Sequence, residues 1–238
     1  MNQILVALDV STARDALALA DRLRGVVGGF KIGSQLFTSE GPSMVRALVD
    51  RGDRVFLDLK FHDIPNTVAG AVAAAADLGV WMVNVHAAGG SAMLAAARQA
   101  AQAAAARRGG NVPLVIAVTV LTSMDDATLR EVGVSQTPIA QVERLARMTQ
   151  AAGLDGVVAS PQEVAAIRQA CGPSFIVVTP GIRGGAATSG PDDQRRTATP
   201  AGAIAAGSSF LVIGRPVTGA ADPRDAARRM AEEIATSR

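Results

Sequence analysis

Lysine, cysteine and aromatic residues are scarce in this 238-residue sequence. A single cysteine, Cys171, excludes a disulfide within the chain and suits the reducing cytosol, so we expect a cytoplasmic protein. Aromatic residues make up 3%, and no basic stripe interleaves with them, which argues against a nucleic-acid partner. The apolar run at the N-terminus stops at Asp9, and no run approaches the ~20 residues of a membrane span, so we expect neither a signal peptide nor a membrane partner.

Only two of the 23 basic residues are lysines, Lys31 and Lys60. Arginine stays protonated under essentially all conditions, whereas a buried lysine can shift its pKa and give up a proton. The two lysines therefore either stand where an ammonium does something that a guanidinium cannot, or occur by chance in an arginine-biased composition. Their positions in the fold decide between these interpretations.

Short segments rich in Val, Ile and Leu alternate with helical patterns along the whole chain, as in parallel sheets covered by helices. Eight β/α units of even spacing predict the α/β class and one domain over residues 1–238, a (β/α)8 TIM barrel. A doubly wound sheet is the alternative, but its nucleotide fingerprint is absent after the first strand. The eight strands are predicted at Ile4–Leu8, Gly29–Ile32, Val55–Leu59, Met82–Val85, Leu114–Leu121, Gly156–Ala159, Phe175–Thr179 and Phe210–Ile213.

Cap signals that contain proline mark several helix starts. Ser160-Pro161-Gln162-Glu163 combines an N-cap serine, a proline at the first helical position and a capping-box glutamate. Thr199-Pro200 and Asp222-Pro223 repeat the cap and the proline. Between residues 125 and 152 we expect a short helix, a break near Pro138 and a longer helix.

The third strand carries opposite charges at its carboxyl end, where the reacting groups of a barrel gather. Alternation along a strand places Phe56, Asp58 and Lys60 on one face and the aliphatic residues between them on the other. Buried charges need partners, and Lys31 and Asp63 are the available ones. We expect an alternating Lys–Asp–Lys–Asp row at the barrel mouth. A purely structural ion-pair network is the alternative, and Asp63 is also placed to cap the following helix.

A long loop rich in glycine and arginine, residues 181–199, follows the seventh strand. Glycine lets backbone N–H groups approach an anion, and arginine binds phosphate bidentately. The loops after strands seven and eight are the usual phosphate site of this fold. A solvated surface loop is the alternative, although a loop of this length in a compact domain is more often a functional lid. We therefore expect a phosphate site in which Arg183, Gln194, Arg195 and Arg196 of this loop act with Gly214-Arg215 after the eighth strand, and a substrate site that also includes Pro180 at the end of the seventh strand.

The ten residues Asp58-Leu59-Lys60-Phe61-His62-Asp63-Ile64-Pro65-Asn66-Thr67 resemble the signature of the orotidine 5′-monophosphate decarboxylase family in its shorter bacterial form. This motif is highly specific, whereas glycine–arginine strand ends alone would be weak. No motif position departs from the family pattern. The resemblance covers essentially the whole chain, including Leu8-Asp9, Phe30-Lys31-Ile32-Gly33, Leu121-Thr122-Ser123, Thr179-Pro180-Gly181-Ile182-Arg183, Asp193-Gln194 and Ile213-Gly214-Arg215-Pro216.

The resemblance implies the last step of de novo pyrimidine nucleotide synthesis, the conversion of orotidine 5′-monophosphate to uridine 5′-monophosphate and carbon dioxide. It implies a homodimer that uses no metal or organic cofactor, with Lys60 as proton donor and Asp58 and Lys31 as its network partners. Asp63 and Thr67 would reach into the site of the other subunit. The implied substrate contacts are Asp9 and Lys31 at the ribose hydroxyls, Thr122 or Ser123 at the pyrimidine, and Arg183, Gln194 and Arg215 at the phosphate.

Two other functions fit parts of the pattern. Magnesium-dependent sugar-phosphate decarboxylases and aldolases of similar fold share an Asp-x-Lys-x-x-Asp motif, but their second strand offers a carboxylate metal ligand where this chain has Lys31. Two lysines beside two aspartates leave too little negative charge for a divalent ion, so we expect no metal site. A non-catalytic phosphate-binding sensor is the second alternative, and it gives no reason for a row of alternating charges.

Overall fold

A computed structural model describes residues 2–183 and 197–236 of the chain. Eight strands form a closed barrel in sequence order, and every neighbouring pair is parallel, including β1 with β8. The expected (β/α)8 barrel is therefore confirmed. The strands are β1 (Ile4–Ala7), β2 (Gly29–Gly33), β3 (Val55–Phe61), β4 (Met82–His86), β5 (Leu114–Val118), β6 (Gly156–Val158), β7 (Ile176–Thr179) and β8 (Phe210–Ile213).

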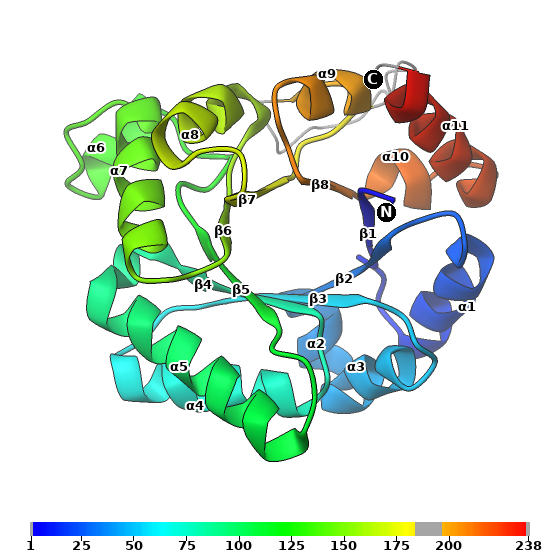
Figure 1. The fold of residues 1–238 in the computed structure, drawn as a ribbon. Coiled ribbons are helices and arrows are strands. Elements are labelled where there is room, and N and C mark those ends of the chain that lie inside the picture. The colour runs from blue at the N-terminus through cyan, green and yellow to red at the C-terminus, as the bar shows by residue number, and fades with distance from the viewer. Residues whose placement is uncertain (1, 184–196, 237–238) are drawn as a thin grey trace.

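Helices surround the barrel on its outside (Figure 1). None of the described helices is long and apolar enough to cross a membrane. The helices are α1 (Ala13–Leu23), α2 (Ser34–Glu40), α3 (Pro42–Val49), α4 (Pro65–Asp77), α5 (Gly90–Arg108), α6 (Asp126–Glu131), α7 (Pro138–Ala151), α8 (Val164–Cys171), α9 (Pro200–Ala205), α10 (Arg215–Thr218) and α11 (Pro223–Thr236), with 3-10 turns η1 (Ala87–Gly89) and η2 (Pro161–Glu163).

The predicted helix starts are confirmed by their hydrogen bonds. Ser160 and Glu163 form a capping box at η2, which leads directly into α8. The Thr199 hydroxyl accepts the N–H of Gly202 at the start of α9. The Asp222 carboxylate accepts backbone N–H groups in the first turn of α11. These local signals therefore determine where the outer helices begin.

Apolar side chains pack on both sides of the strands. The larger buried cluster joins strand residues to helix residues and fills the layer between barrel and helices. The smaller cluster has buried members from strands alone, which places it inside the ring. Along β3, Phe56 belongs to the inner cluster and Val55 and Leu57 to the outer one, as alternation predicts. The buried members of the inner cluster are Leu5, Phe56, Met82, Ile116 and Val178.

The fifth strand is shorter than predicted and ends at Val118 instead of Leu121. Thr119 directs both its N–H and its hydroxyl to the carbonyl oxygen of Val158, at 3.3 and 3.0 Å. The chain then turns, and the N–H of Met124 donates to the carbonyl oxygen of Leu121. Composition alone does not reveal this turn, because Val120 and Leu121 continue the apolar pattern after the single polar residue Thr119.

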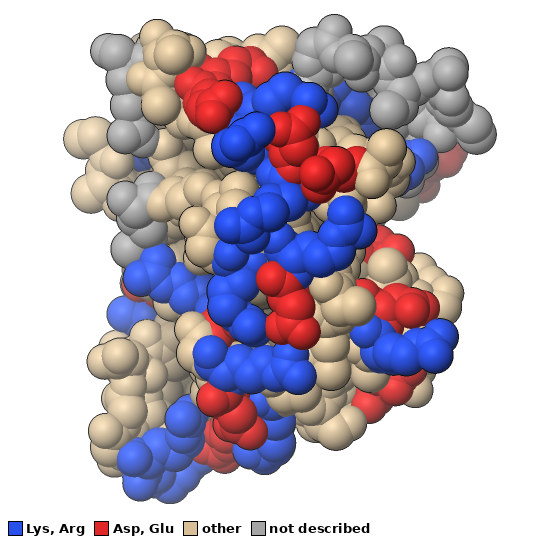
Figure 2. All heavy atoms as spheres, turned by 90° about the vertical axis from the view of Figure 1, so that its right-hand side faces the viewer, with Lys and Arg blue, Asp and Glu red and all other residues tan. Residues whose placement is uncertain are grey.

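Arginines alternate with acidic residues on the side of the molecule that carries α1 and α11 (Figure 2). Arg24 donates to both carboxylate oxygens of Asp53, at 2.9 and 2.6 Å, and to Asp21 at 3.0 Å. On α11, Arg228 donates to Asp225 at 2.6 Å. The Asp53 side chain is only 6% exposed, whereas Asp21 and Arg228 are exposed and ion pairs of that exposed kind each contribute little stability. They do neutralise the arginines locally, so this face has mixed charge.

Candidate active site

A hollow of about 440 Å³ opens at the carboxyl ends of the strands. Its apolar floor is made by Phe56, Val158 and Val212, whose strands surround the barrel interior. The polar wall comes from residues at or just after the ends of six strands, β1, β2, β3, β5, β7 and β8. Nine expected site residues line this one hollow: Asp9, Lys31, Asp58, Lys60, Thr122, Pro180, Arg183, Gly214 and Arg215.

The carboxylate of Asp58 lies between the two lysines of the chain. Its Oδ1 accepts a hydrogen bond from Lys60 Nζ at 2.7 Å, and its Oδ2 lies 3.5 Å from Lys31 Nζ. Lys31 Nζ also donates to Asp9 Oδ1 at 3.2 Å. The charges therefore alternate in the order Asp9, Lys31, Asp58, Lys60, and the four side chains together are neutral.

Asp63 is not a member of this row, which corrects the predicted arrangement. Its side chain is exposed and accepts the N–H of Ile64 at 2.6 Å, and it forms no ion pair with any other described residue. It is not the N-cap of α4 either, because Ile64 occupies that position. Asp9 takes the fourth place instead, since β1 pairs with β2 and Asp9, just after β1, accepts a hydrogen bond from Lys31. Thr67 is also exposed, on the first turn of α4.

Asp58 and Lys31 are buried, with 9% and 8% of their surface exposed. Burial by itself would raise the pKa of Asp58. The positive charges of Lys31 and Lys60, with hydrogen bonds from Lys60 and Asn84, outweigh burial and lower the pKa of this carboxyl below its ordinary value. The carboxylate therefore stays ionised and can hold the Lys60 ammonium by charge.

Asn84 is a site residue that the sequence reasoning did not select. It lies fully buried on β4, where its Nδ2 donates to Asp58 Oδ1 at 2.7 Å. Its Oδ1 accepts the backbone N–H of Lys60 at 2.8 Å. The signal that could have found it is an amide two residues after Met82, on the inward face of the strand and between the apolar residues Val83 and Val85.

The backbone of β3 is irregular at Lys60. Leu57 pairs with Val83 and Phe61 with Val85, so β3 holds two more residues than β4 between these pairs. Lys60 has a φ of 53°, and no other described non-glycine residue has a positive φ. A left-handed conformation of this kind is unfavourable by about 1–3 kcal/mol and persists only where its surroundings enforce it. Simple alternation therefore does not explain where Lys60 points.

The two ends of the loop 181–199 are joined to each other. Ile182 and Ala198 form an isolated bridge, in which Arg183 N–H donates to Ala198 O at 2.9 Å and Ala198 N–H donates to Gly181 O at 3.2 Å. Gly181 has a φ of 78°, a conformation that favours glycine. This junction directs Arg183 to the wall of the hollow. The expected phosphate ligands Gln194, Arg195 and Arg196 lie outside the described residues.

The structure separates the two residues considered for the pyrimidine, because Thr122 lines the hollow and Ser123 is exposed outside it. The rings of His62 and His86 lie next to each other, with centroids 5.4 Å apart and planes tilted by 33°, and neither lines the hollow. Burial, followed by the nearby charges of His62 and Lys60, lowers the pKa of His86. His86 therefore stays neutral to lower pH than an ordinary histidine.

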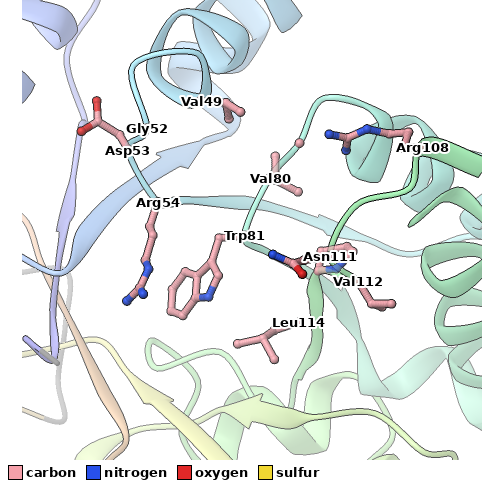
Figure 3. Close-up of a pocket in the computed structure, with 12 residues that line it drawn as sticks. Val49, Gly52, Asp53, Arg54, Val80, Trp81, Arg108, Asn111, Val112 and Leu114 are labelled. Carbon is pink, nitrogen blue, oxygen red and sulfur yellow. The ribbon is translucent and has the colours of Figure 1, made fainter. Parts of the chain in front are cut away.

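A second hollow, of about 570 Å³, lies at the opposite end of the barrel, where β3, β4 and β5 begin (Figure 3). Trp81 and Arg54 face each other there, with the guanidinium carbon 5.6 Å from the centroid of the indole ring. Trp81 also packs edge-on against Phe210. The acidic residue in the wall of this second hollow, Asp53, is already paired with Arg24. The amino-terminal end of the strands in a barrel usually serves stability, and the cluster of Asp9, Lys31, Asp58 and Lys60 lies at the other end.

Known proteins share this sequence and this fold. The model of the orotidine 5′-phosphate decarboxylase / HUMPS family matches residues 2–230. A protein of Moorella thermoacetica named orotidine 5′-phosphate decarboxylase is 55% identical over 234 residues, which cover 98% of this chain and 92% of the relative. A protein of the same name from Pasteurella multocida is 50% identical over 237 residues and covers 100% and 99%.

A solved structure of a protein with the same name as these two relatives has a similar fold. The crystal structure of orotidine 5′-phosphate decarboxylase from Lactobacillus acidophilus superposes with a TM-score of 0.87 at 37% identity, over 98% of this chain and 99% of that chain. Family model, sequence relatives and solved structure therefore cover the same, nearly complete length. The chain belongs to the orotidine 5′-phosphate decarboxylase / HUMPS family.

Proposed function

We propose that this protein decarboxylates orotidine 5′-monophosphate to uridine 5′-monophosphate, the last step of de novo pyrimidine nucleotide synthesis, with Lys60 as proton donor. Relatives that carry this activity in their names are 50% or more identical over nearly the whole chain, which supports the reaction. The observation that carries the mechanism is the 2.7 Å contact between Lys60 Nζ and Asp58 inside the hollow.

The chemistry explains why an ammonium is needed. When the bond between carbon 6 and the carboxylate breaks, its electron pair stays on carbon 6 and carbon dioxide leaves. An ammonium fixed beside that carbon stabilises the negative charge as it develops and then transfers a proton to it. Lys60 is left neutral and regains a proton from water. Asp58 orients the ammonium, and its own charge near the substrate carboxylate favours departure of carbon dioxide.

The remaining wall residues fit the other parts of the nucleotide. Asp9 and Lys31 lie side by side at 3.2 Å and are proposed to bind the ribose hydroxyls, and Thr122 is proposed to face the pyrimidine. Arg183 and Arg215 flank the same hollow beside Pro180 and Gly214, as a phosphate site after strands seven and eight requires. Gln194 stays a predicted phosphate ligand. Binding the phosphate far from the bond that breaks can supply energy to organise the site.

We propose that no metal or organic cofactor takes part. The magnesium-dependent sugar-phosphate lyases remain the alternative. Lys31 occupies the second-strand position at which they would place a carboxylate ligand, and both carboxylates beside it are paired with ammonium groups. Such a neutral cluster has little attraction for a divalent ion.

The test is to add EDTA-treated protein to orotidine 5′-monophosphate and follow the ultraviolet absorbance change as the product forms. We expect turnover by the wild type without added metal, and near-total loss in Lys60→Ala. Lys60→Arg keeps the charge but does not give up a proton, so it should also be nearly inactive. Activity that EDTA abolishes and magnesium restores would favour the metal-dependent alternative. Binding without product would favour a phosphate sensor.

A homodimer with shared sites is the second part of the proposal. Asp63 and Thr67 are exposed at the start of α4 and are not part of the wall of their own chain's hollow, and Ile64 between them is 66% exposed. A partner subunit that covers this turn would place Asp63 beside the Lys60 cluster of the other chain. A cytosolic location, expected from the single cysteine, stays a prediction.

Mixed subunits test the shared sites. Lys60→Ala and Asp63→Ala proteins should each be nearly inactive. After co-refolding in equal amounts, each mixed dimer would have one site with both native residues, so about a quarter of the wild-type activity should return. Confirmed mixed dimers without recovered activity would contradict the proposal.

A further inference from the structure

We propose that Asn84 is a positioning residue for the proton transfer: its side-chain amide fixes the left-handed backbone of Lys60 and, with the same group, the carboxylate of Asp58 that binds the Lys60 ammonium. The inference rests on the proposed role of Lys60 as proton donor. It concerns a side chain on a neighbouring strand, 24 residues further along the chain.

The first step of the argument is the irregularity in β3. The two extra residues between Leu57 and Phe61 interrupt the ladder to β4, so the N–H of Lys60 cannot pair with a backbone carbonyl in regular register. Asn84 stands on β4 opposite this interruption and supplies the acceptor, at 2.8 Å. A buried N–H without a partner is strongly disfavoured. The side-chain oxygen of Asn84 thus accepts the N–H of Lys60, the residue with the positive φ.

The second step is the direction of the amide. Its oxygen faces the Lys60 N–H and its nitrogen faces Asp58 Oδ1, at 2.8 and 2.7 Å. The reversed amide would oppose donor to donor and oxygen to carboxylate, so the neighbours dictate the orientation. An ionised aspartate has no donor, serine and threonine have a single oxygen, and glutamine is one carbon longer. Asparagine is therefore the side chain that makes both contacts across this gap.

The third step links these contacts to Lys60 Nζ. Asp58 Oδ1 accepts from both Asn84 Nδ2 and Lys60 Nζ, each at 2.7 Å. The chain of contacts closes on itself, from the Lys60 backbone through Asn84 and Asp58 to the Lys60 ammonium. The fully buried Asn84 amide thereby contacts the backbone of Lys60 directly and its ammonium through Asp58. Losing it should displace the ammonium while leaving the ribose and phosphate contacts in place.

The experiment measures kcat and KM for three variants with orotidine 5′-monophosphate. In Asn84→Ala we expect kcat to fall by about a hundredfold and KM to change by no more than about threefold, because misplacing a reacting group by ~1 Å reduces the rate on that scale. Thr119→Val is the matched control, since it also removes a buried strand hydrogen bond, to Val158 O at 3.0 Å, without touching Asp58. Its kcat should stay within about twofold of the wild type.

Asn84→Asp keeps the shape of the side chain and should make kcat depend on pH in a way that it does not in the wild type. The introduced carboxyl oxygen would face Asp58 Oδ1 at hydrogen-bond distance, which two carboxyl groups tolerate only while they share a proton. The ratio of variant to wild-type kcat should therefore fall as pH rises from about 6 to about 9, when that proton is lost. Lys31, Lys60 and His86 are also ionisable groups close to this pair, but they are present in both proteins, so their effects largely cancel in the ratio.

The outcomes separate this inference from the proposed function. If Asn84→Ala keeps kcat within about threefold of the wild type, or the Asn84→Asp ratio does not change with pH, the positioning role is wrong. If Asn84→Ala does not fold, the isosteric Asn84→Asp variant decides alone. Lys60→Ala is assayed alongside. Undiminished activity in that variant refutes the proton donor itself, whereas an inactive Lys60→Ala with normal Asn84 variants refutes only the inference.

Discussion

Replacing Asp58 with asparagine tests whether the charge cluster is as tightly coupled as its geometry indicates. Asp58 lies 2.7 Å from Lys60 Nζ and 3.5 Å from Lys31 Nζ, which corresponds to attractions of about 6 and about 5 kcal/mol at an effective dielectric constant of ~20. Desolvation of the charges offsets much of this in the intact cluster. Removing the carboxylate alone leaves two ammonium groups opposed only by Asp9.

Breaking one member of a buried ion pair typically destabilises a protein by about 3–5 kcal/mol. The lower end applies here, because the Lys60 side chain is 36% exposed and water can solvate its ammonium. We therefore expect Asp58→Asn to lower the free energy of unfolding by about 3 kcal/mol. For a chain of this size that corresponds to a melting temperature about 6–12 °C lower.

Urea unfolding at one fixed protein concentration measures this difference. Asp77→Asn is the matched control, since its partner Arg107 is 3.5 Å away and both side chains are largely exposed. It should change stability by less than about 1 kcal/mol. The double variant Asp58→Asn/Lys31→Met removes the surplus charge and should recover part of the loss. An Asp58→Asn protein as stable as the control would refute the reasoning.

The pH dependence of stability gives an independent check. The pKa of Asp58 is lower in the folded state than its ordinary value of 3.8, so its stabilising contribution is present above that value and is lost as pH falls through the folded-state pKa. Asp58→Asn removes this contribution. The variant should therefore lose less additional stability in acid than the wild type does. If the free energy of unfolding falls equally in both proteins at low pH, the lowered pKa of Asp58 is contradicted.

Three further predictions concern other parts of the molecule. Burial lowers the pKa of His86 below its ordinary value of 6.5, so wild-type stability should fall as pH drops through 6.5. The free energy of unfolding, measured with urea at several pH values, should depend less steeply on pH in His86→Gln. A Cβ at Gly156 would lie 2.1 Å from the carbonyl oxygen of Ile176, so Gly156→Ala should lower the melting temperature sharply or prevent folding. Arg215→Gln should raise KM for the nucleotide by about tenfold or more, and a KM equal to that of the wild type would argue against a phosphate contact.

Local sequence patterns were sufficient for most of the fold. The strands follow short segments rich in apolar residues, and η2, α9 and α11 begin where the predicted cap residues Ser160, Thr199 and Asp222 indicate. The exception is the end of β5, where Thr119 directs its N–H and hydroxyl to Val158 on β6 although Val120 and Leu121 continue the apolar pattern. Composition reports burial, but hydrogen-bond geometry decides where a strand stops.

By itself, the sequence determined the alternation of strands and helices, the two lysines among arginines and the motif that places Asp58 and Lys60 two residues apart. Only the tertiary structure decided which residues complete the cluster. The pairing of β1 with β2 sets Asp9 beside Lys31, and the irregular register between β3 and β4 sets Asn84 beside Lys60, while Asp63 is exposed. Such partners are remote along the chain, and no local period encodes them, because they depend on which strands meet and in what register.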